Sequence, residues 1–353
     1  MFSIDCSPML SLPMRFQLYA LAASLLLCAT GCPSAPTPGS GSGGSSAAGG
    51  VPAPATVRLG YFANLTHAQA VLGVASGDFE KAITPSKLET RVFNAGPSLI
   101  EALNAGAIDI GYVGPGPAIS GHGRSHGEAL RVIAGAAANG VVVVVAKDSK
   151  VTKLEELNGR KLGTPQVGNT QDIAAKHFVK DTTGIIAVPN AEQRAMFENG
   201  SLEAAWVPEP WGAYLVSQAG AKILLEEKDL WPEKEFVLTL VVTTPKFLKE
   251  HPEVVENILK VHRSYTAKLV ADPKALEPEL GKALFDLTKK SLPEGVISTA
   301  LTRIKFTDEP LLGSLEAMNK WTTELGFARE EASLEGLVDT TLLRKLQNAK
   351  ETP

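Results

Sequence analysis

The sequence predicts an α/β protein that is divided into two lobes, and three observations lead to this fold class. Short apolar, strand-like segments alternate with helical segments from residue 57 to residue 225, which is typical of parallel sheets flanked by helices. Two apolar segments, 138–147 and 236–243, carry the chain from one α/β half into the next and back, so we expect them to form a hinge. From Pro245 onward helical spacing dominates, which predicts a helical C-terminal extension.

The first lobe is predicted to contain residues 56–140 and 243–353. Its first helix should cover 66–76 with Thr66 as the N-cap, and its second should cover 98–104 and end at Gly106. Strands of this lobe are expected at 57–62, 88–93, 108–113 and 130–137.

The second lobe is predicted to contain residues 141–242. It opens with an apolar segment, 141–147, that is almost entirely valine, as expected for a strand covered on both faces. Further strands are expected at 161–164, 185–188, 204–207, 222–225 and 236–243, with helices at 170–180, 192–199 and 210–218.

The remainder of the chain is predicted to be helical. Amphipathic spacing is the basis, and no strand is predicted after residue 245. The expected helices cover 252–270, 273–290, 296–303, 311–325 and 340–349.

The N-terminal region resembles that of an exported bacterial lipoprotein. Arg15 precedes an apolar stretch, 18–28, that has the length of a signal peptide and is too short to span a bilayer. Small residues then precede Cys32, as in a lipobox, although Ala29 stands where that pattern usually has leucine. We therefore interpret residues 1–31 as a signal peptide and Cys32 as the lipidation site. Residues 32–55 then form a flexible tether rich in Gly, Ser and Pro.

Two alternatives for this region stay open from the sequence. One is an ordinary secretory signal with a chance cysteine at position 32. The other concerns the start, because Met14 would begin a more typical signal peptide than Met1. In every case the folded part is expected to work outside the cytoplasmic membrane.

Composition excludes several classes of function. The net charge of −4 gives no electrostatic footprint for nucleic acid. All three cysteines precede residue 33, so the folded part has no disulfide, no catalytic thiol and no zinc site built on thiolate. His122 and His126 alone share a short spacing, and we interpret residues 120–127 as a solvated Gly-rich loop. No metal site and no cofactor are predicted.

Two loops of the first lobe are candidates for ligand binding. The strand-to-helix turn 60–68 contains Tyr61, Asn64 and His67, although an Asn in this position can simply cap a helix. Residues 111–119 are a stronger candidate, because glycine allows close approach of the backbone and proline suits the first helical position. The candidate residues there are Tyr112, Gly114, Pro115 and Gly116.

The second lobe contributes two further candidate loops. Residues 163–172 lead from a strand into a helix, and free N–H groups with hydroxyl and amide side chains there would accept an anion. The candidates are Gln166, Gly168, Asn169, Thr170 and Gln171, and no Gly-Lys-Ser/Thr follows, so this is not a nucleotide P-loop. Residues 205–212 add Glu209, which could pair with a cation or favour a helix start, and Trp211, which could present an apolar face.

From residue 57 to its end the chain resembles the solute-binding proteins of bacterial ABC importers for aliphatic sulfonates, taurine and nitrate. Segments 93–98, 109–117, 164–172 and 206–212 carry the resemblance, whereas 182–189 is shorter than in many relatives. The resemblance implies a two-lobed type II periplasmic-binding-protein fold that closes on an oxyanion-bearing solute and has no enzymatic activity. Its implied partners are a permease and its ATPase, and its implied state is a monomer anchored to the membrane by lipid.

Three alternatives compete with this function. An enzyme on the same fold would need a catalytic His or Cys, and His67 is the only histidine in a candidate loop. A binding protein for a thiamin pyrimidine precursor would stack the ring on Tyr61, Tyr112 and Trp211 and bind an amino group with Glu209. A sensor domain without a permease would keep the fold and the site. No Lys or Arg occurs in the four loops, so an anion would be bound by N–H groups and neutral donors.

Overall fold

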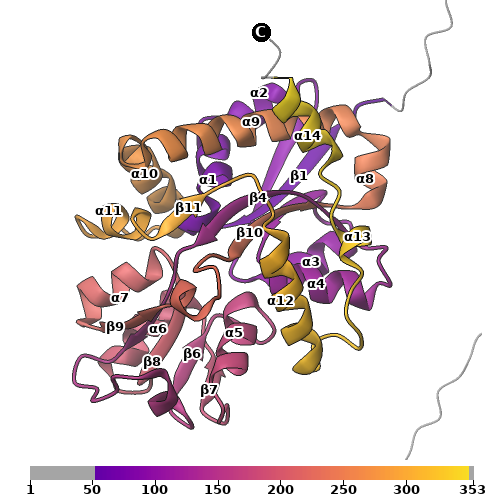
Figure 1. Ribbon diagram of the computed structural model, residues 1–353. Coiled ribbons are helices and arrows are strands. Elements are labelled where there is room, and N and C mark those ends of the chain that lie inside the picture. Colours follow the sequence, from indigo (N-terminus) through magenta and orange to yellow (C-terminus); the bar gives the residue numbers. More distant parts are fainter. Residues whose placement is uncertain (1–51, 350–353) are drawn as a thin grey trace, which may run out of the picture. The chain divides into compact units, whose positions relative to one another are not determined.

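A computed structural model describes residues 52–349 of the chain (Figure 1). The predicted signal peptide, Cys32 and nearly all of the predicted tether lie outside the described residues. The described residues belong to one compact unit. Within the described part, no helix combines the length and the apolar character needed to cross a membrane.

Six strands form the first sheet, which contains both the start of the described chain and its return near residue 240. The strand order is β11-β4-β10-β3-β1-β2. The strands are β1 (Thr56–Phe62), β2 (Lys87–Phe93), β3 (Ile110–Val113), β4 (Arg131–Asn139), β10 (Val237–Thr243) and β11 (Ile304–Phe306).

Five strands form the second sheet, in the order β7-β6-β8-β5-β9. The chain enters this sheet from β4 through Gly140, whose φ of 74° lies in the left-handed region that glycine adopts freely. It leaves after β9, because β10 already belongs to the first sheet. The strands are β5 (Val141–Val145), β6 (Leu162–Thr164), β7 (Ile185–Ala187), β8 (Ala204–Pro208) and β9 (Lys222–Glu226).

Both sheets are mixed, whereas the sequence pattern predicted parallel sheets. Strands β1, β2 and β3 are parallel to one another, and so are β6, β7 and β8. The strands next to the crossings run the other way: β10 is antiparallel to β3 and β4, and β5 is antiparallel to β8 and β9. A strand that enters a sheet directly from the neighbouring sheet has no crossover helix to reverse it, which explains the difference.

Helices cover the sheets (Figure 1). The α-helices are α1 (Ala68–Ala75), α2 (Asp78–Ala82), α3 (Gly96–Asn104), α4 (Pro115–Arg124), α5 (Thr170–Phe178), α6 (Asn190–Glu198), α7 (Trp211–Ala219), α8 (Pro245–Glu250), α9 (Pro252–Ala271), α10 (Glu277–Thr288), α11 (Val296–Leu301), α12 (Leu312–Glu324), α13 (Leu334–Leu337) and α14 (Thr341–Asn348). The short 3-10 helices are η1 (Leu65–His67), η2 (Leu154–Leu157), η3 (Glu227–Leu230) and η4 (Pro273–Leu276).

Three sequence predictions about these elements are wrong. Thr66 lies inside η1, and the N-cap position is Asn64. Strand β11 follows residue 245, where no strand was predicted, because its three residues are too few to show an alternating pattern. Residues 120–124 form the end of α4, so the solvated loop predicted at 120–127 is largely helical. His122 in that helix is buried, with Nδ1 3.3 Å from the Leu130 carbonyl oxygen, and burial lowers its pKa.

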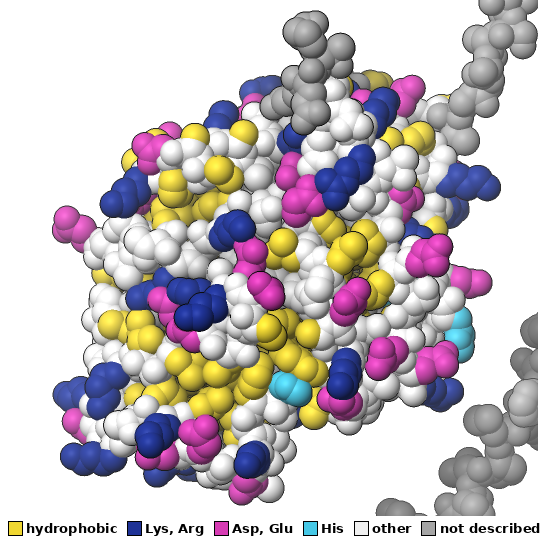
Figure 2. Space-filling view, in the orientation of Figure 1, with side chains coloured by type: hydrophobic (Ala, Val, Ile, Leu, Met, Phe, Trp, Pro, Cys, Tyr) yellow, Lys and Arg dark blue, Asp and Glu magenta, His cyan; other side chains and the backbone are white. Residues whose placement is uncertain are grey.

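Helix α12 packs against both halves of the fold. It contacts α4, beside the first sheet, and α5, beside the second. Its Trp321 stacks on His177 with ring centroids 4.0 Å apart, and it belongs to an apolar cluster that includes Val113 of β3 and Val143 of β5. Figure 2 shows hydrophobic side chains gathered in this part of the surface, where α12 borders the second sheet.

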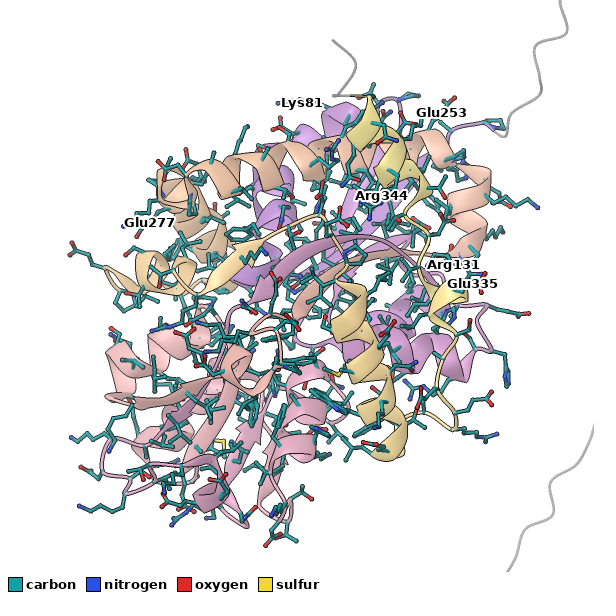
Figure 3. The ribbon with its side chains drawn as sticks, viewed as in Figure 1. Lys81, Arg131, Glu253, Glu277, Glu335 and Arg344 are labelled. Atoms are coloured by element: carbon teal, nitrogen blue, oxygen red, sulfur yellow. The ribbon has the colours of Figure 1, made fainter. Side chains whose placement is uncertain are left out.

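The C-terminal helix α14 is held against the half of the fold that contains the first sheet by an ion pair and a hydrogen bond. Arg344, which is labelled in Figure 3, forms a two-pronged ion pair with the Glu309 carboxylate at 2.6 and 2.7 Å. Arg263 of α9 donates to the Leu346 carbonyl oxygen at 2.6 Å. The predicted C-terminal helices are therefore integrated into the fold rather than appended to it.

Candidate functional site

A cavity of about 30 Å³, the inner cavity, lies between the two sheets. A cavity of roughly 10–15 Å³ is enough to hold one water molecule, so the inner cavity accommodates a group of a few heavy atoms. The inner cavity is lined by Phe62, Asn64, Thr66, His67, Asn94, Ala95, Gly96, Gly114, Pro117, Pro165, Asn169, Thr170, Gln171, Asn190, Pro208, Leu238 and Thr239.

The loops 114–117 and 166–170, from two of the candidate loops, meet at this cavity. The Gly116 N–H donates to Thr170 Oγ1 at 3.4 Å. A Cβ atom on Gly114 would lie 2.2 Å from the same oxygen, so only glycine permits this approach. The two loops are therefore in direct contact, and they bring the two halves of the fold together around the cavity.

A chain of hydrogen bonds orients the side chain of Gln171 as a donor. The backbone N–H of Asp172 donates to Asn169 Oδ1 at 2.8 Å, which fixes the amide of Asn169. Asn169 Nδ2 must then donate to Gln171 Oε1, at 2.8 Å. Gln171 therefore presents the two N–H hydrogens of its Nε2 to the cavity.

Asn64 is oriented in the same way from the opposite side of the cavity. The indole Nε1–H of Trp211, which can only donate, contacts Asn64 Oδ1 at 2.8 Å. The Asn64 NH₂ group is thus the part of the amide that remains available. Asn64 follows β1 of the first sheet and Trp211 begins α7 after β8 of the second, so this hydrogen bond also holds the halves together.

His67 provides a neutral donor at the cavity wall. Burial lowers its pKa to about 3, so the ring is uncharged at neutral pH. The Phe62 N–H points to Nδ1 at 3.4 Å, and Nδ1 is therefore the acceptor nitrogen. The proton then resides on Nε2, which gives the ring one N–H donor.

Thr239 is a lining residue that the sequence analysis did not identify. It lies on β10 with its side chain fully buried, and its Oγ1 has no hydrogen-bond partner among the described residues. A buried hydroxyl without a partner costs roughly 1–3 kcal/mol, so its retention at the cavity calls for a ligand. The sequence offered one indication of this residue, because Thr239 is the single polar residue in the apolar segment 236–242.

Other lining residues were also missed, because they lie outside the four candidate loops. Asn94 and Gly96 follow β2, and Asn190 begins α6 after the short segment 182–189. No motif in the sequence indicates these residues as ligand-binding. They come together only because the ends of their strands meet in the fold. Thr66 and Phe62 belong to the first candidate loop but were not singled out.

Four helices begin at the inner cavity and make its potential positive. The first or capping residues of α3, α4, α5 and α6 line it. Among the described residues, no acceptor faces the backbone N–H groups of Thr170 and Gln171. Helix N-termini favour anions, and no Lys, Arg, Asp or Glu lines this cavity. The site is therefore built from neutral donors that suit a small anion.

Three predicted aromatic site residues do not line the inner cavity. Tyr61 and Tyr112 are buried in the apolar core, and Tyr112 Oη lies 2.9 Å from His262 Nδ1. Alternation along β1 turns Tyr61 toward that core and leaves Phe62 at the cavity. Trp211 lies beside the inner cavity and touches it only through Asn64.

Glu209 is likewise turned away from the inner cavity. It is fully buried, with Oε1 2.6 Å from Arg303 Nη1, and Oε2 accepts from the Ala213 N–H at 3.0 Å. Burial raises the pKa of this carboxyl, and Arg303 opposes that shift. Glu209 thus stabilises the start of α7 and joins the two halves.

The remaining predicted residues support the loops without lining the cavity. Gly168, with a φ of 73°, packs against Phe327 instead of approaching a ligand. Gln166 Oε1 accepts from Ser98 Oγ at 3.4 Å across the two halves. Pro115 and Gly116 begin α4 behind Gly114. The predicted residues that line the inner cavity are Asn64, His67, Gly114, Asn169, Thr170 and Gln171.

Two mixed α/β sheets joined at crossings, with helix N-termini converging between them, define the class of periplasmic binding proteins. A nitrate-binding periplasmic protein of Synechocystis shares this fold, with a TM-score of 0.71 and 18% identity over 86% of this chain and 91% of that chain. The chain belongs to the NMT1-like family, which it matches over residues 50–282.

Two curated relatives are binding proteins. One, from Bacillus subtilis, is named an aliphatic sulfonates-binding protein and is 27% identical over 82% of this chain and 87% of its own length. The other, the taurine-binding periplasmic protein of Escherichia coli, is 24% identical over 75% of this chain and 77% of its own length. Both relatives are named for binding a solute and not for catalysing a reaction.

Proposed function

We propose that this protein is an extracytoplasmic solute-binding protein that captures an organic sulfonate and delivers it to an ABC permease and its ATPase. The observation that carries the proposal is the inner cavity, in which neutral donors and four helix N-termini converge and no charged side chain is present. A sulfonate has three acceptor oxygens that share one negative charge, and several N–H groups bind such a group strongly. The names of the relatives support the same ligand class.

The alternative of a pyrimidine ligand receives no support from the contacts. The residues proposed to stack on its ring, Tyr61, Tyr112 and Trp211, do not line the inner cavity. Glu209, proposed to bind its amino group, already pairs with Arg303.

Calorimetry and thermal melting of the purified protein test the proposed function. Ethanesulfonate should bind and raise the melting temperature, because a ligand that binds only the folded state stabilises it by mass action. Nitrate, bicarbonate and an aminopyrimidine serve as comparison ligands. Stabilisation by the pyrimidine with no effect of any sulfonate would contradict the proposal.

The arrangement of lobes is part of the proposal. We infer that residues 56–140 with 243–353 and residues 141–242 move as two lobes, and that the structure corresponds to their closed arrangement. Contacts between the two halves support a closed cleft, namely Asn64–Trp211, Gly116–Thr170 and Arg303–Glu209.

We also propose that Cys32 carries the lipid that holds the protein at the outer face of the cytoplasmic membrane. The small residues before Cys32 and the tether after it support this role. The substitution Cys32→Ser should release the protein into the soluble fraction or leave it unprocessed. Incorporation of labelled palmitate measures the modification, and continued labelling of the variant would contradict the assignment.

A further inference from the structure

A second cavity of about 220 Å³, the outer cavity, adjoins the inner one. The two cavities share three lining residues, Asn64, Asn94 and Asn190, so amide groups from both halves of the fold lie between them. A ligand whose headgroup fills the inner cavity would extend its tail past these amides into the outer cavity.

The walls of the outer cavity suit an apolar body. Val92, Phe93, Trp211 and Leu287 line it, and they come from both halves of the fold. A cavity of about 150 Å³ with apolar walls accommodates benzene, so a volume of about 220 Å³ holds a chain of several carbons or one ring.

The charge of the outer cavity is set by Lys290. No carboxylate lines this cavity within the described part of the chain, and Lys290 is its charged lining residue. Lys290 follows α10, and its Nζ donates to the Ala191 carbonyl oxygen of α6 at 3.3 Å. An ammonium group has three donors, so two remain for a ligand.

We propose that the outer cavity is a second subsite, in which Lys290 recognises an acidic group at the far end of the solute. The substrate class is then a sulfonate with a short apolar body and a terminal carboxylate. This inference rests on the proposed function, since it assumes that the headgroup is a sulfonate. Lys290 attracts the carboxylate and repels an ammonium group, so an amino-terminated sulfonate such as taurine is disfavoured.

Three ligands of equal chain length test the subsite by calorimetry: sulfopropionate, propanesulfonate and aminopropanesulfonate. We expect sulfopropionate to bind about threefold to tenfold more tightly than propanesulfonate, as for a partly exposed charged hydrogen bond. Aminopropanesulfonate should bind more weakly than propanesulfonate by a similar factor. Alkanesulfonates without a charged terminal group should gain about fourfold for each methylene group that enters the apolar walls.

The variant Lys290→Gln should remove the differences between the three ligands and leave the affinity for propanesulfonate within about twofold. Lys274→Gln is the matched control, because Lys274 is exposed in η4 and does not line either cavity. It changes the net charge equally and should preserve the ranking.

The outcomes separate the two proposals. Equal affinities of the three ligands, or an unchanged ranking in Lys290→Gln, would overturn the subsite while sulfonate binding stands. Failure of all three ligands to bind would overturn the proposed function together with the subsite.

Discussion

At the scale of single residues, the hydroxyl of Thr239 should serve the ligand and not the fold. Replacing it by Val keeps the shape and removes a buried group that has no partner among the described residues. The free energy of unfolding without ligand should stay equal or rise by about 1 kcal/mol, whereas the affinity for ethanesulfonate should fall about tenfold. Urea unfolding and calorimetry measure the two quantities.

Thr243 is the matched control for this prediction, on the same strand β10. It is buried too, but its hydroxyl donates to the Asp109 carbonyl oxygen at 2.9 Å. Thr243→Val should therefore lose about 1 kcal/mol of stability and keep its affinity. If Thr239→Val lost stability and kept its affinity in the same way, the hydroxyl would have a structural role only.

At the scale of elements, the start of α5 both stabilises the helix and presents the donors. Asn169 is its N-cap, and Asn169 also orients Gln171. The substitution Asn169→Ala should cost about 1 kcal/mol of unfolding free energy through the lost cap, and it should weaken sulfonate binding about tenfold because the Gln171 amide is no longer held. Melting curves and calorimetry report the two effects.

Thr244→Ala removes a comparable cap from another helix. Thr244 Oγ1 accepts from the Phe247 N–H at the start of α8, at 3.1 Å, and it does not line the inner cavity. We expect a similar loss of stability with no change in affinity. Equal affinities of the two variants would show that the loop before α5 does not orient ligand donors.

At the scale of the whole molecule, the sequence predicted the two α/β halves, the crossings and most helices, because these follow from local periodicity. Its prediction of parallel sheets was wrong for the strands next to the crossings, since their direction depends on which sheet a crossing strand joins. For the site, the candidate residues Gly114 and Asn169–Gln171 line the inner cavity, because backbone geometry and capping are local properties that the sequence shows. Thr239 and Asn190 line it without having been candidates, and the candidates Tyr112 and Glu209 do not line it, because packing decides which face of a strand or helix meets the cavity.

The pH dependence of stability should show that Glu227 is a neutral group in the folded molecule up to about neutral pH. Glu227 is buried near the return of the chain to the first sheet, and its carboxyl accepts from the indoles of Trp206 and Trp231 at 2.6 and 3.2 Å. Trp231 in turn stacks on Phe236, with ring centroids 5.0 Å apart. Burial raises the pKa of Glu227 to about 7, although the two indole donors oppose the shift.

The sign follows from proton binding. Between pH 4.5, the ordinary pKa of glutamate, and about 7, the folded state keeps the proton of Glu227 and the unfolded state releases it. Rising pH therefore lowers the free energy of unfolding, by about 3 kcal/mol over the whole window. His67 and His262, with pKa values lowered to about 3 and about 4, act in the opposite direction below pH 6.5, because there the unfolded state binds the extra protons.

The variant Glu227→Gln isolates this contribution. It should be less stable at acidic pH, since its NH₂ group faces one indole donor, but its stability should no longer fall between pH 4.5 and about 7. Urea unfolding at several pH values gives the pH dependence of the free energy of unfolding for both proteins. A loss of stability in the variant that is the same at every pH does not affect this comparison. The buried Glu209 and the histidines remain in both proteins and cancel in the comparison. Parallel slopes would mean that Glu227 is ionised in the folded state, and the carboxyl would then be stabilised by the indole donors alone.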